Sequence, residues 1–462
     1  MLNWIIDHLL LTLLFLVVFT IFSYTTRGER PLHNILAWLL FAFLVPYVAI
    51  LLFLIVGQRK LRWIPQKNVT MDTHPCKKNP SGTHSMENLL STYGVPPPTY
   101  NNKTSLLSDG VVAYDKIVEL FQNAKESILI STYRVTDDEV GDSIVKLLTQ
   151  KAQQGVRVYL LIDTVGGFMQ FPRRKLKLLK QAGGSVRYIM PLFHTPFKGH
   201  ANLRDHRKMM IIDGQYGIVG GMNLAKDYLG PTPYEKRWCD ISMLIEGGAV
   251  NALLSIFESD WQFAAAYQES KNYTRPVVST EKCGNAELQI VASGPDLMGD
   301  NLYDAVLSEI YDASQSIHIV TPYFVLDECL QKALLLAVRR GVDVNIIVPV
   351  HSNHPLTDAV RAVDVRKLHD EGAKIWFYQP TMLHAKVMLF DNTVAILGSA
   401  NFDLRSLLLN FEISCFMYSQ PEIQDISSWI QSILANCLLH TPNASRTRIA
   451  FEYMMQILKP LS

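Results

Sequence analysis

The sequence has no excess of charge of either sign. Lys and Arg number 43 and Asp and Glu 42, so the formal net charge of the 462-residue chain is +1 at pH 7. Proteins that hold nucleic acid through their overall electrostatic field carry a clear positive excess. The balance therefore disfavours a nucleic-acid partner, although local basic patches remain compatible with phosphate binding.

Cysteines are few and scattered. None of the six lies in a CxxC spacing, and the one CxxH, from Cys437 to His440, has no CxxC pair to complete the ligand set of a structural zinc site. A disulfide framework is equally unsupported, so we predict no metal site and a reducing compartment. The six residues are Cys76, Cys239, Cys283, Cys329, Cys415 and Cys437.

Long uncharged stretches occur near the N-terminus. Residues 9–26 and 35–56 contain no charged side chain, and about 20 apolar residues are enough for a helix to cross a bilayer. Two transmembrane helices are the favoured interpretation, with a cleaved signal peptide or buried core helices as the alternatives. More basic residues follow the second run than lie between the two runs, which predicts that the N-terminus and the large C-terminal portion are cytoplasmic.

Composition and repetition divide the chain into four parts. We predict a membrane anchor over residues 1–60 and a linker over residues 61–104, which is rich in Pro, Asn, Ser and Thr. Two similar domains follow, over residues 105–270 and 271–462. Each has an apolar strand segment, a helical pattern and a second strand that opens with Gly-Val. Alternation of this kind indicates an α/β sandwich with a largely buried sheet.

The strongest internal repeat joins a histidine, a lysine, an aspartate and an asparagine. Residues 206–223 read HRKMMIIDGQYGIVGGMN and residues 384–401 read HAKVMLFDNTVAILGSAN, at a constant offset of 178. The histidine and lysine stand two residues apart, so a strand points them to one face. Asp-Gly and Asp-Asn predict hairpin turns, and the small residues that end the returning strand let a ligand approach. Two gap-free copies make coincidence very improbable.

These residue types fit covalent phosphoryl transfer. A neutral imidazole can attack phosphorus, and a protonated one can give a proton to a leaving alcohol. Lysine and asparagine beside it supply positive charge and a hydrogen-bond donor to the developing phosphorane. Two facing copies would provide one histidine as nucleophile and the other as general acid, with the roles exchanged in the second step.

The paired motif resembles the HKD signature of the phospholipase D superfamily, and residues 398–406, GSANFDLRS, resemble the continuation of its second copy. The resemblance covers the chain from about residue 105 and implies duplicated α/β sandwich domains related by pseudo-twofold symmetry. The apolar segments, with Arg30-Pro31 and Ala37-Trp38-Leu39, resemble the anchor of bacterial cardiolipin synthases. This second resemblance implies a multi-pass protein of the inner (cytoplasmic) membrane.

The resemblance also implies which residues form the site, with His206 favoured as the nucleophile. A further carboxylate commonly orients each histidine in such enzymes, and Asp240 and Glu412 are the candidates, with a surface or capping role as the alternative. The two motif aspartates could be turn formers first and catalytic only indirectly. The implied catalytic set is His206, Lys208, Asp213, His384, Lys386 and Asp391, and the implied substrate-phosphate ligands are Asn223, Asn401, Gly221 and Ser399.

The implied reaction exchanges one phosphodiester for another. A phosphatidyl group passes from one phosphatidylglycerol to a second, giving cardiolipin and glycerol through a covalent phosphohistidine, with no cofactor. Consistent with this, the chain has no GxxxxGK[ST] phosphate loop and no DGxxAR-type pattern of CDP-alcohol phosphotransferases. The predicted partners are phosphatidylglycerol, other membrane phospholipids and the bilayer, with no nucleic acid; a homo-oligomer is compatible with the sequence.

Several alternatives share these motifs. A phospholipase D-type hydrolase or another phosphatidyltransferase would carry both copies unchanged. A nuclease or other phosphodiesterase is disfavoured by the neutral charge and the apolar anchor. An inactive lipid-binding scaffold is disfavoured because neither copy has lost a His, Lys or Asp. Near the C-terminus, apolar residues at helical spacing over 451–458 predict a packing helix, with an interfacial, membrane-binding role as the alternative.

Overall fold

The described residues of the computed structural model are 2–25, 32–56, 85–168, 172–191, 201–265, 273–278, 282–297, 299–439 and 444–456. The basic residues on which the predicted membrane orientation rests lie outside this part of the chain, at Arg27, Arg30 and within 57–84.

The apolar N-terminal runs form α1 (Leu2–Thr25), α2 (Leu32–Leu44) and α3 (Pro46–Val56). The sequence predicts a single helix for the second run, which is wrong: Pro46 has no N–H to donate, and α2 ends before it. Phe15, Phe19 and Phe53 pack together in a small core of these helices. Among the described residues, no helix meets the length and apolarity required to cross a membrane.

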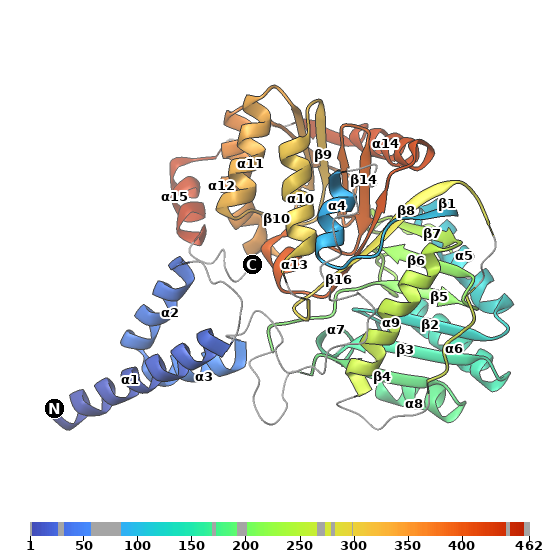
Figure 1. Ribbon diagram of the computed structural model, residues 1–462, viewed down its shortest axis with the longest axis horizontal. Helices are drawn as coiled ribbons and strands as arrows, with labels where there is room; N and C mark the ends of the chain where they lie inside the picture. The colour runs from blue at the N-terminus through green and yellow to red at the C-terminus, as the bar shows by residue number, and fades with distance from the viewer. Residues whose placement is uncertain are drawn as a thin grey trace.

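A 15-stranded sheet organises the body, in the order β17-β12-β11-β9-β13-β14-β16-β8-β1-β7-β6-β5-β2-β3-β4 (Figure 1). The first half holds β1 (Thr99–Leu107), β2 (Ser127–Thr132), β3 (Arg157–Asp163), β4 (Ser185–Ile189), β5 (Met209–Ile212), β6 (Tyr216–Gly220) and β7 (Ser242–Glu246). The second holds β8 (Ala286–Ser293), β9 (Ser316–Val320), β11 (Asp343–Pro349), β12 (Lys374–Tyr378), β13 (Val387–Phe390), β14 (Val394–Gly398), β16 (Glu412–Met417) and β17 (Cys437–Leu439). A separate parallel pair joins β10 (Phe324–Val325) to β15 (Phe402–Asp403).

The two halves repeat the same topology. Outward from the β1–β8 junction, an antiparallel set leads to three parallel strands, β2-β3-β4 on one side and β9-β11-β12 on the other. The hairpin strand β5 pairs antiparallel with β2, and β13 pairs with β9 in the same way. The predicted duplicated α/β fold is confirmed, and β17 is an extra edge strand of the second half.

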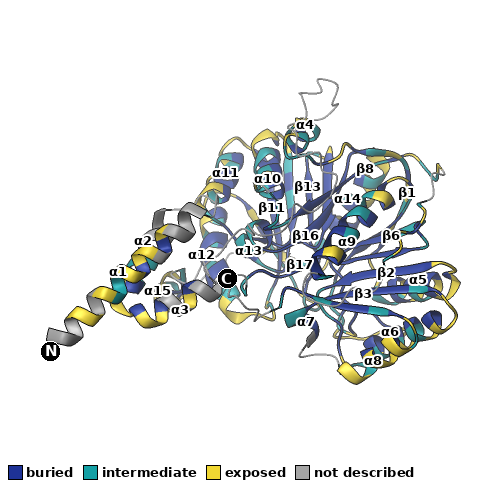
Figure 2. Cartoon of the chain, turned by 60° about the horizontal axis from the view of Figure 1, so that its bottom comes forward, coloured by how far each residue is buried: buried dark blue, intermediate teal, exposed yellow. Residues whose placement is uncertain are grey.

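Helices cover both faces of the sheet (Figures 1 and 2). One face of the first half packs on α5, α6 and α8, and the matching face of the second half packs on α4, α10 and α11. The helices α9 and α14 share one central core with strands of both halves. The bounds are α4 (Ser85–Thr92), α5 (Gly110–Asn123), α6 (Glu139–Gln153), α7 (Thr164–Phe168), α8 (Arg173–Gln181), α9 (Ala249–Ala265), α10 (Asn301–Asp312), α11 (Glu328–Arg339), α12 (Pro355–Asp370), α13 (Leu404–Leu408), α14 (Gln420–Leu434) and α15 (Arg446–Met455).

Residues 85–104, predicted to be linker, belong to the folded body. The helix α4 inserts Met86 and Leu90 into the core of the second half, and β1 is hydrogen-bonded to both β7 and β8. The polar composition of this segment is misleading because Asn102 is buried and its amide donates to the Thr99 and Ala286 carbonyls. The domain boundaries themselves stay a prediction.

The motif aspartates lie in the predicted hairpin turns. Asp213 and Gly214 have φ values of 52° and 63°, and Asp391 and Asn392 have values of 49° and 53°. Positive φ at both central residues is the type I′ geometry that suits the twist of a two-stranded hairpin. The predicted β5–β6 and β13–β14 hairpins are therefore confirmed.

Each of these aspartates also ties its hairpin to the neighbouring strand. The Asp391 carboxylate accepts hydrogen bonds from the backbone N–H groups of residues 314–316 at 2.6 to 2.8 Å. The Asp213 carboxylate accepts from those of residues 125–127, each at 2.8 Å. Burial acts to raise the pKa of Asp391, but these backbone donors outweigh it and lower the pKa below its ordinary value.

Replacing Asp391 by Ala should lower the free energy of unfolding by about 2 kcal/mol at pH 7, because three backbone donors lose a charged acceptor. The lowered pKa means that this stabilisation is complete above about pH 4 and is lost as the pH falls further. Urea denaturation at pH 7 and pH 3 measures both effects. Asp425→Ala, an exposed change on α14, is the matched control; equal stability of the two variants would contradict the anchoring role.

Candidate active site

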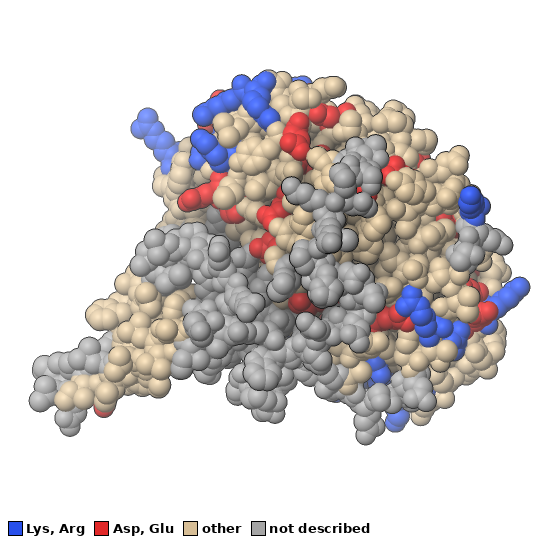
Figure 3. All heavy atoms as spheres, in the orientation of Figure 1, with Lys and Arg blue, Asp and Glu red and all other residues tan. Residues whose placement is uncertain are grey.

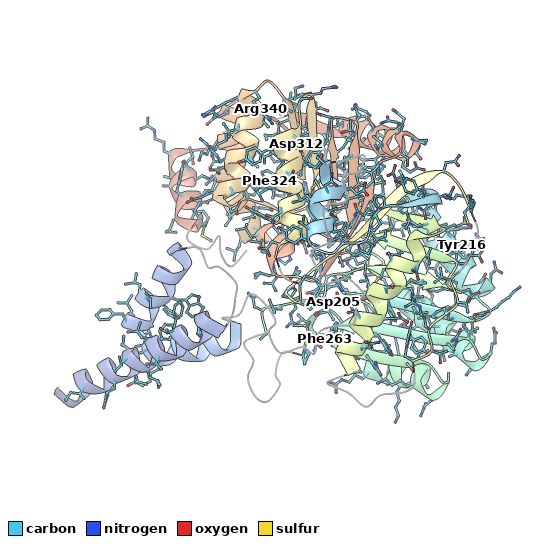
Figure 4. The ribbon with its side chains drawn as sticks, viewed as in Figure 1. Asp205, Tyr216, Phe263, Asp312, Phe324 and Arg340 are labelled. Atoms are coloured by element: carbon cyan, nitrogen blue, oxygen red, sulfur yellow. The ribbon has the colours of Figure 1, made fainter. Side chains whose placement is uncertain are left out.

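His206 is held by the second half of the fold. It follows Asp205, which forms an isolated parallel bridge with Phe411, and Figure 4 shows Asp205 where the two halves meet. The His206 amide donates to the Phe411 carbonyl at 2.9 Å. Glu412 comes next, and its carboxylate oxygens lie 3.0 and 3.1 Å from His206 Nδ1.

His384 is held by the first half in the same way. Cys239 forms a parallel bridge with Leu383, and the His384 amide donates to the Cys239 carbonyl at 2.7 Å. Asp240 comes next, and its Oδ2 lies 2.7 Å from His384 Nδ1. Both carboxylates singled out from the sequence therefore contact a histidine, and in each case the histidine belongs to the opposite half.

The histidine and lysine of each motif do not lie within a strand, as the sequence predicts, but in the extended segment that precedes it. The strand β5 begins at Met209 and β13 at Val387. Because the backbone of residues 205–206 bonds to the other half, it leaves the ladder of its own sheet. The departure from the sheet is what carries each motif into the junction.

Glu412 is stabilised as a carboxylate. Ser399 Oγ donates to it, and Asn410 Nδ2 donates at 3.3 Å. Burial acts to raise the pKa of Glu412, but His206, Lys208 and the Ser399 hydroxyl outweigh it, so the pKa lies below its ordinary value. An ionised carboxylate can only accept, so we assign the His206 proton to Nδ1, which leaves the lone pair on Nε2.

Asp240 has a different environment. Burial raises its pKa to about 7, and the Ile241 backbone N–H donates to Oδ1 at 2.7 Å. The position that corresponds to Ser399 is Gly221, where an added Cβ would lie 2.1 Å from Asp240 Oδ1. No side chain, and hence no hydroxyl donor, fits there, so Asp240 lacks the contact that Ser399 gives to Glu412.

Burial lowers the pKa of both histidines. The pKa of His206 falls to about 4, with the charge of Lys208 contributing, and that of His384 falls well below its ordinary value, with Lys386 contributing. Both imidazoles are therefore uncharged at neutral pH. The side chain of His206 is 14% exposed and that of His384 is 5% exposed, so His206 is the more accessible of the two.

The two lysines sit directly beside the histidines. Lys208 Nζ donates to the His206 carbonyl at 2.8 Å, and burial lowers its pKa to about 8. Lys386 Nζ lies 2.7 Å from Nδ1 and 3.3 Å from Nε2 of His384, and burial lowers its pKa to about 7. Asp240, His384 and Lys386 thus form one cluster, in which the pKa values of Asp240 and Lys386 both lie near neutral pH.

Aromatic rings that the sequence reasoning missed enclose the histidines. The Tyr133 ring meets the His206 ring edge-on at 5.3 Å. The rings of Tyr228 and Trp238 lie 5.0 and 5.3 Å from that of His384. Aromatic residues are common in any core, so nothing in their spacing distinguishes these three in the sequence.

The motif asparagines are open to a ligand, whereas the motif aspartates are remote. The buried Oδ1 atoms of Asn223 and Asn401 have no hydrogen-bond partner within the described part of the chain, and a buried polar atom of this kind calls for a ligand atom.

Asp213 and Asp391 lie at the far ends of β5 and β13 from the histidines. No group of three or more His, Cys, Asp or Glu side chains among the described residues is placed to hold a metal ion.

Arg207, the middle residue of the first His-x-Lys, was also missed. Its Nη1 lies 2.6 Å from both carboxylate oxygens of Asp260 on α9. Its Nε and Nη2 donate to the backbone carbonyls of Glu412 and Ser293, each at 3.0 Å. A fully buried ion pair of the first half therefore positions the Glu412 strand of the second. Ala385 occupies this place in the second copy, so the repeat gives no signal for it.

Two histidine–carboxylate pairs that meet at the junction of duplicated α/β halves define an enzyme of the phospholipase D superfamily. The chain belongs to the cardiolipin synthase family within it, because residues 117–261 and 306–434 match the family described as "Cardiolipin synthase, PLD-like domain".

Curated relatives agree with this assignment. A probable cardiolipin synthase of Bacillus subtilis is 31% identical over 441 residues, which cover 91% of this chain and 86% of that one. A cardiolipin synthase of Bacillus cereus is 32% identical over 86% of this chain and 82% of its own. Among solved structures, phosphatidylserine synthase of Haemophilus influenzae has a TM-score of 0.60 at 13% identity, over 78% of this chain and 93% of that one. That likeness shows the shared fold.

Replacing His206 by Gln should make the fold less sensitive to acid. The folded pKa of His206 is about 4, so between this value and the ordinary value of about 6.5 the unfolded chain binds more protons than the folded one. Wild-type stability should therefore fall by about 2 kcal/mol from this group between pH 7 and pH 5. Urea denaturation at both pH values should show a smaller loss in the variant, while His351→Gln, an exposed control, keeps the wild-type loss.

Replacing Arg207 by Met should lower the free energy of unfolding by about 3–5 kcal/mol, because the buried Asp260 carboxylate loses its guanidinium. Adding Asp260→Leu in the same chain should restore part of that stability. Chemical denaturation of the two single variants and the double variant measures the coupling. Additive losses would contradict a coupled, buried ion pair between Arg207 and Asp260.

Proposed function

We propose that this chain is a cardiolipin synthase that transfers the phosphatidyl group of one phosphatidylglycerol to another through a covalent phosphohistidine, releasing glycerol. The observation that carries the proposal is the presence of two uncharged histidines, each oriented by a carboxylate, at one junction. One can attack phosphorus while the other moves the proton. The family and its named relatives support the substrate class.

The different carboxylates suggest different roles for the histidines. Ionised Glu412 keeps the proton of His206 on Nδ1, so Nε2 is free to attack. Asp240, with a pKa of about 7, is protonated in part of the population at neutral pH and then donates to His384 Nδ1. His384 in that state carries its proton on Nε2, where a general acid needs it.

In the first step, His206 Nε2 attacks phosphorus and forms the nitrogen–phosphorus bond. The bond from phosphorus to the glycerol oxygen breaks, and His384 Nε2 gives its proton to that oxygen. At the same time His384 Nδ1 takes the proton of Asp240, so the imidazole stays uncharged and Asp240 becomes a carboxylate. Glycerol leaves, and the phosphatidyl group remains on His206. Lys208 and Lys386, both buried beside the histidines, supply positive charge to the phosphorane oxygens.

In the second step, the terminal hydroxyl of another phosphatidylglycerol attacks the phosphorus of the intermediate. His384 takes the hydroxyl proton, the nitrogen–phosphorus bond breaks and cardiolipin is released. Asn223 and Asn401, whose amide oxygens are buried without a protein donor among the described residues, are suited to bind polar groups of the two headgroups. Ser399 donates to the Glu412 carboxylate and Gly221 leaves room for the Asp240 carboxylate, so neither is assigned to the phosphate. Asp213 and Asp391 are assigned to stabilising the hairpins that carry the motifs.

The N-terminal helices are proposed to attach the chain to the inner membrane as a multi-pass anchor, with the body in the cytoplasm. The uncharged runs support this, as do the many exposed apolar side chains on α1 to α3 (Figure 2). The drawn surface of these helices is almost free of Lys, Arg, Asp and Glu (Figure 3). A contiguous apolar surface of this kind marks contact with lipid or with another protein. Examples are Leu10, Leu13, Leu14, Val17, Leu40, Phe43, Leu44 and Tyr47.

The domain division is also a proposal. Residues 105–270 and 271–462 are taken as the two catalytic domains, and the family matches over 117–261 and 306–434 fall one within each. Because β1 and β8 pair at the centre of one sheet, we expect the two domains to unfold together.

Lipid analysis of the purified chain in phosphatidylglycerol vesicles tests the function. Wild type should yield cardiolipin and free glycerol in equal amounts. His206→Ala and His384→Ala should each reduce the rate by at least about a hundredfold, since each removes a group from both steps. His351→Ala, at an exposed position, should retain wild-type turnover.

The products and the bound label separate the alternatives. Phosphatidic acid without cardiolipin would make the enzyme a hydrolase, and no lipid turnover would contradict the proposal. With phosphatidylglycerol labelled at phosphorus, His384→Ala should retain label on the protein and His206→Ala should not. The opposite pattern would make His384 the nucleophile.

A further inference from the structure

The C-terminal helix α15 buries a charged residue and exposes large apolar ones. Glu452 is 1% exposed, whereas Phe451, Tyr453 and Met454 are 50%, 61% and 58% exposed. A surface helix in water normally does the reverse, with its apolar stripe inside and its charges outside. The sequence predicts a packing helix here, and the described part does pack, but with most of its apolar side chains on the outside.

Contacts with α12 fix the rotation of α15 about its own axis, and so determine which of its side chains are exposed. Glu452 pairs with Arg366 of α12 and accepts from Arg448 Nε at 2.9 Å. Met455 packs with Val360 of α12 in a small core. A helix turned to bury its phenylalanine instead would have to break these ion pairs.

The helix α15 lies on the same side of the body as the apolar N-terminal helices. Figure 1 shows α15 near one end of α2, and Figure 2 shows α15 and the N-terminal helices on the same side of the body. The small core beneath α15 includes Val325 of β10, and β10 pairs with β15, which begins directly after Asn401. The helix is therefore linked through β10 to the site and stands on the side of the anchor.

We infer that α15 is an interfacial helix that sets the catalytic body against an anionic phospholipid bilayer. Phe451 and Met454, three residues apart, lie on one face of the helix and enter the acyl boundary, with Tyr453 at the level of the headgroups. Arg446 and Arg448 in the first turn are exposed and complement phospholipid phosphates. This inference rests on the proposed function. A bilayer fits better than a second copy of the chain because the exposed Arg446 and Arg448 suit anionic phosphates and α15 lies on the same side of the body as the apolar α1 to α3.

Photocrosslinking in the full chain tests the contact. p-Benzoylphenylalanine in place of Phe451 should form adducts with radiolabelled phosphatidylglycerol in vesicles. The same probe in place of Tyr311, an exposed residue of α10, should not. Adducts between two protein chains at position 451 would make α15 a dimer interface and overturn the inference. Equal lipid labelling at both positions, or none at 451, would overturn it as well.

Turnover gives an independent readout. The double variant Phe451→Gln/Met454→Gln should process phosphatidylglycerol about tenfold more slowly at limiting vesicle concentration, because it loses apolar membrane contact. Its rate on a short-chain phosphatidylglycerol kept below micelle formation should match wild type, as should that of Tyr311→Gln on both substrates. If wild type turns over neither substrate, the proposed function fails. If wild type is active and the double variant equals it on vesicles, the inference alone fails.

Discussion

The exchange of backbone bridges between the two halves is the constraint on which the site depends. Each histidine leaves its own sheet, donates its amide to a carbonyl of the other half and thereby meets that half's carboxylate. The Arg207–Asp260 pair reinforces one of these bridges from within the core, by binding the Glu412 carbonyl. The catalytic geometry is therefore a property of the interface between repeats, and the hairpins tied down by Asp213 and Asp391 give each repeat the rigidity to present its motif.

The two halves of the site are not chemically equivalent, although their folds match. One contribution to the difference comes from a pair of corresponding positions, beside the charges of His206 and Lys208 that lower the pKa of Glu412. Ser399 supplies a hydroxyl to Glu412, whereas Gly221 leaves room only for the Asp240 carboxylate itself. Burial raises the pKa of Asp240 to about 7, while the donors around Glu412 hold its pKa low. A duplicated fold thus carries two acid–base environments, as a mechanism with one nucleophile and one proton carrier requires.

The sequence predicted most of the architecture because the repeat is explicit in it. Two motif copies at a constant offset predicted duplicated α/β halves, the hairpins and the histidine–lysine pairs. It could not show that Asp240 and Glu412 serve the opposite half, because pairing across an interface leaves no local periodicity. It misjudged β1, whose buried Asn102 is satisfied by hydrogen bonds, and the second apolar run, where Pro46 ends a helix. Arg207 and the aromatic rings were missed because neither repeats between the copies.

Each carboxylate contacts the histidine of the opposite half, and this arrangement bears on how such a site could arise and change. A single repeat holds a histidine and a carboxylate that cannot serve each other, so a lone ancestral unit would have been complete only when two copies met face to face. In a dimer of identical copies, each residue must suit both the nucleophile and the proton carrier. Once the two copies are fused into one chain, corresponding residues can differ and each can suit one role. Ser399, at the position where the first copy has Gly221, is a difference of the kind that such a release would leave, and it gives the two carboxylates different neighbours.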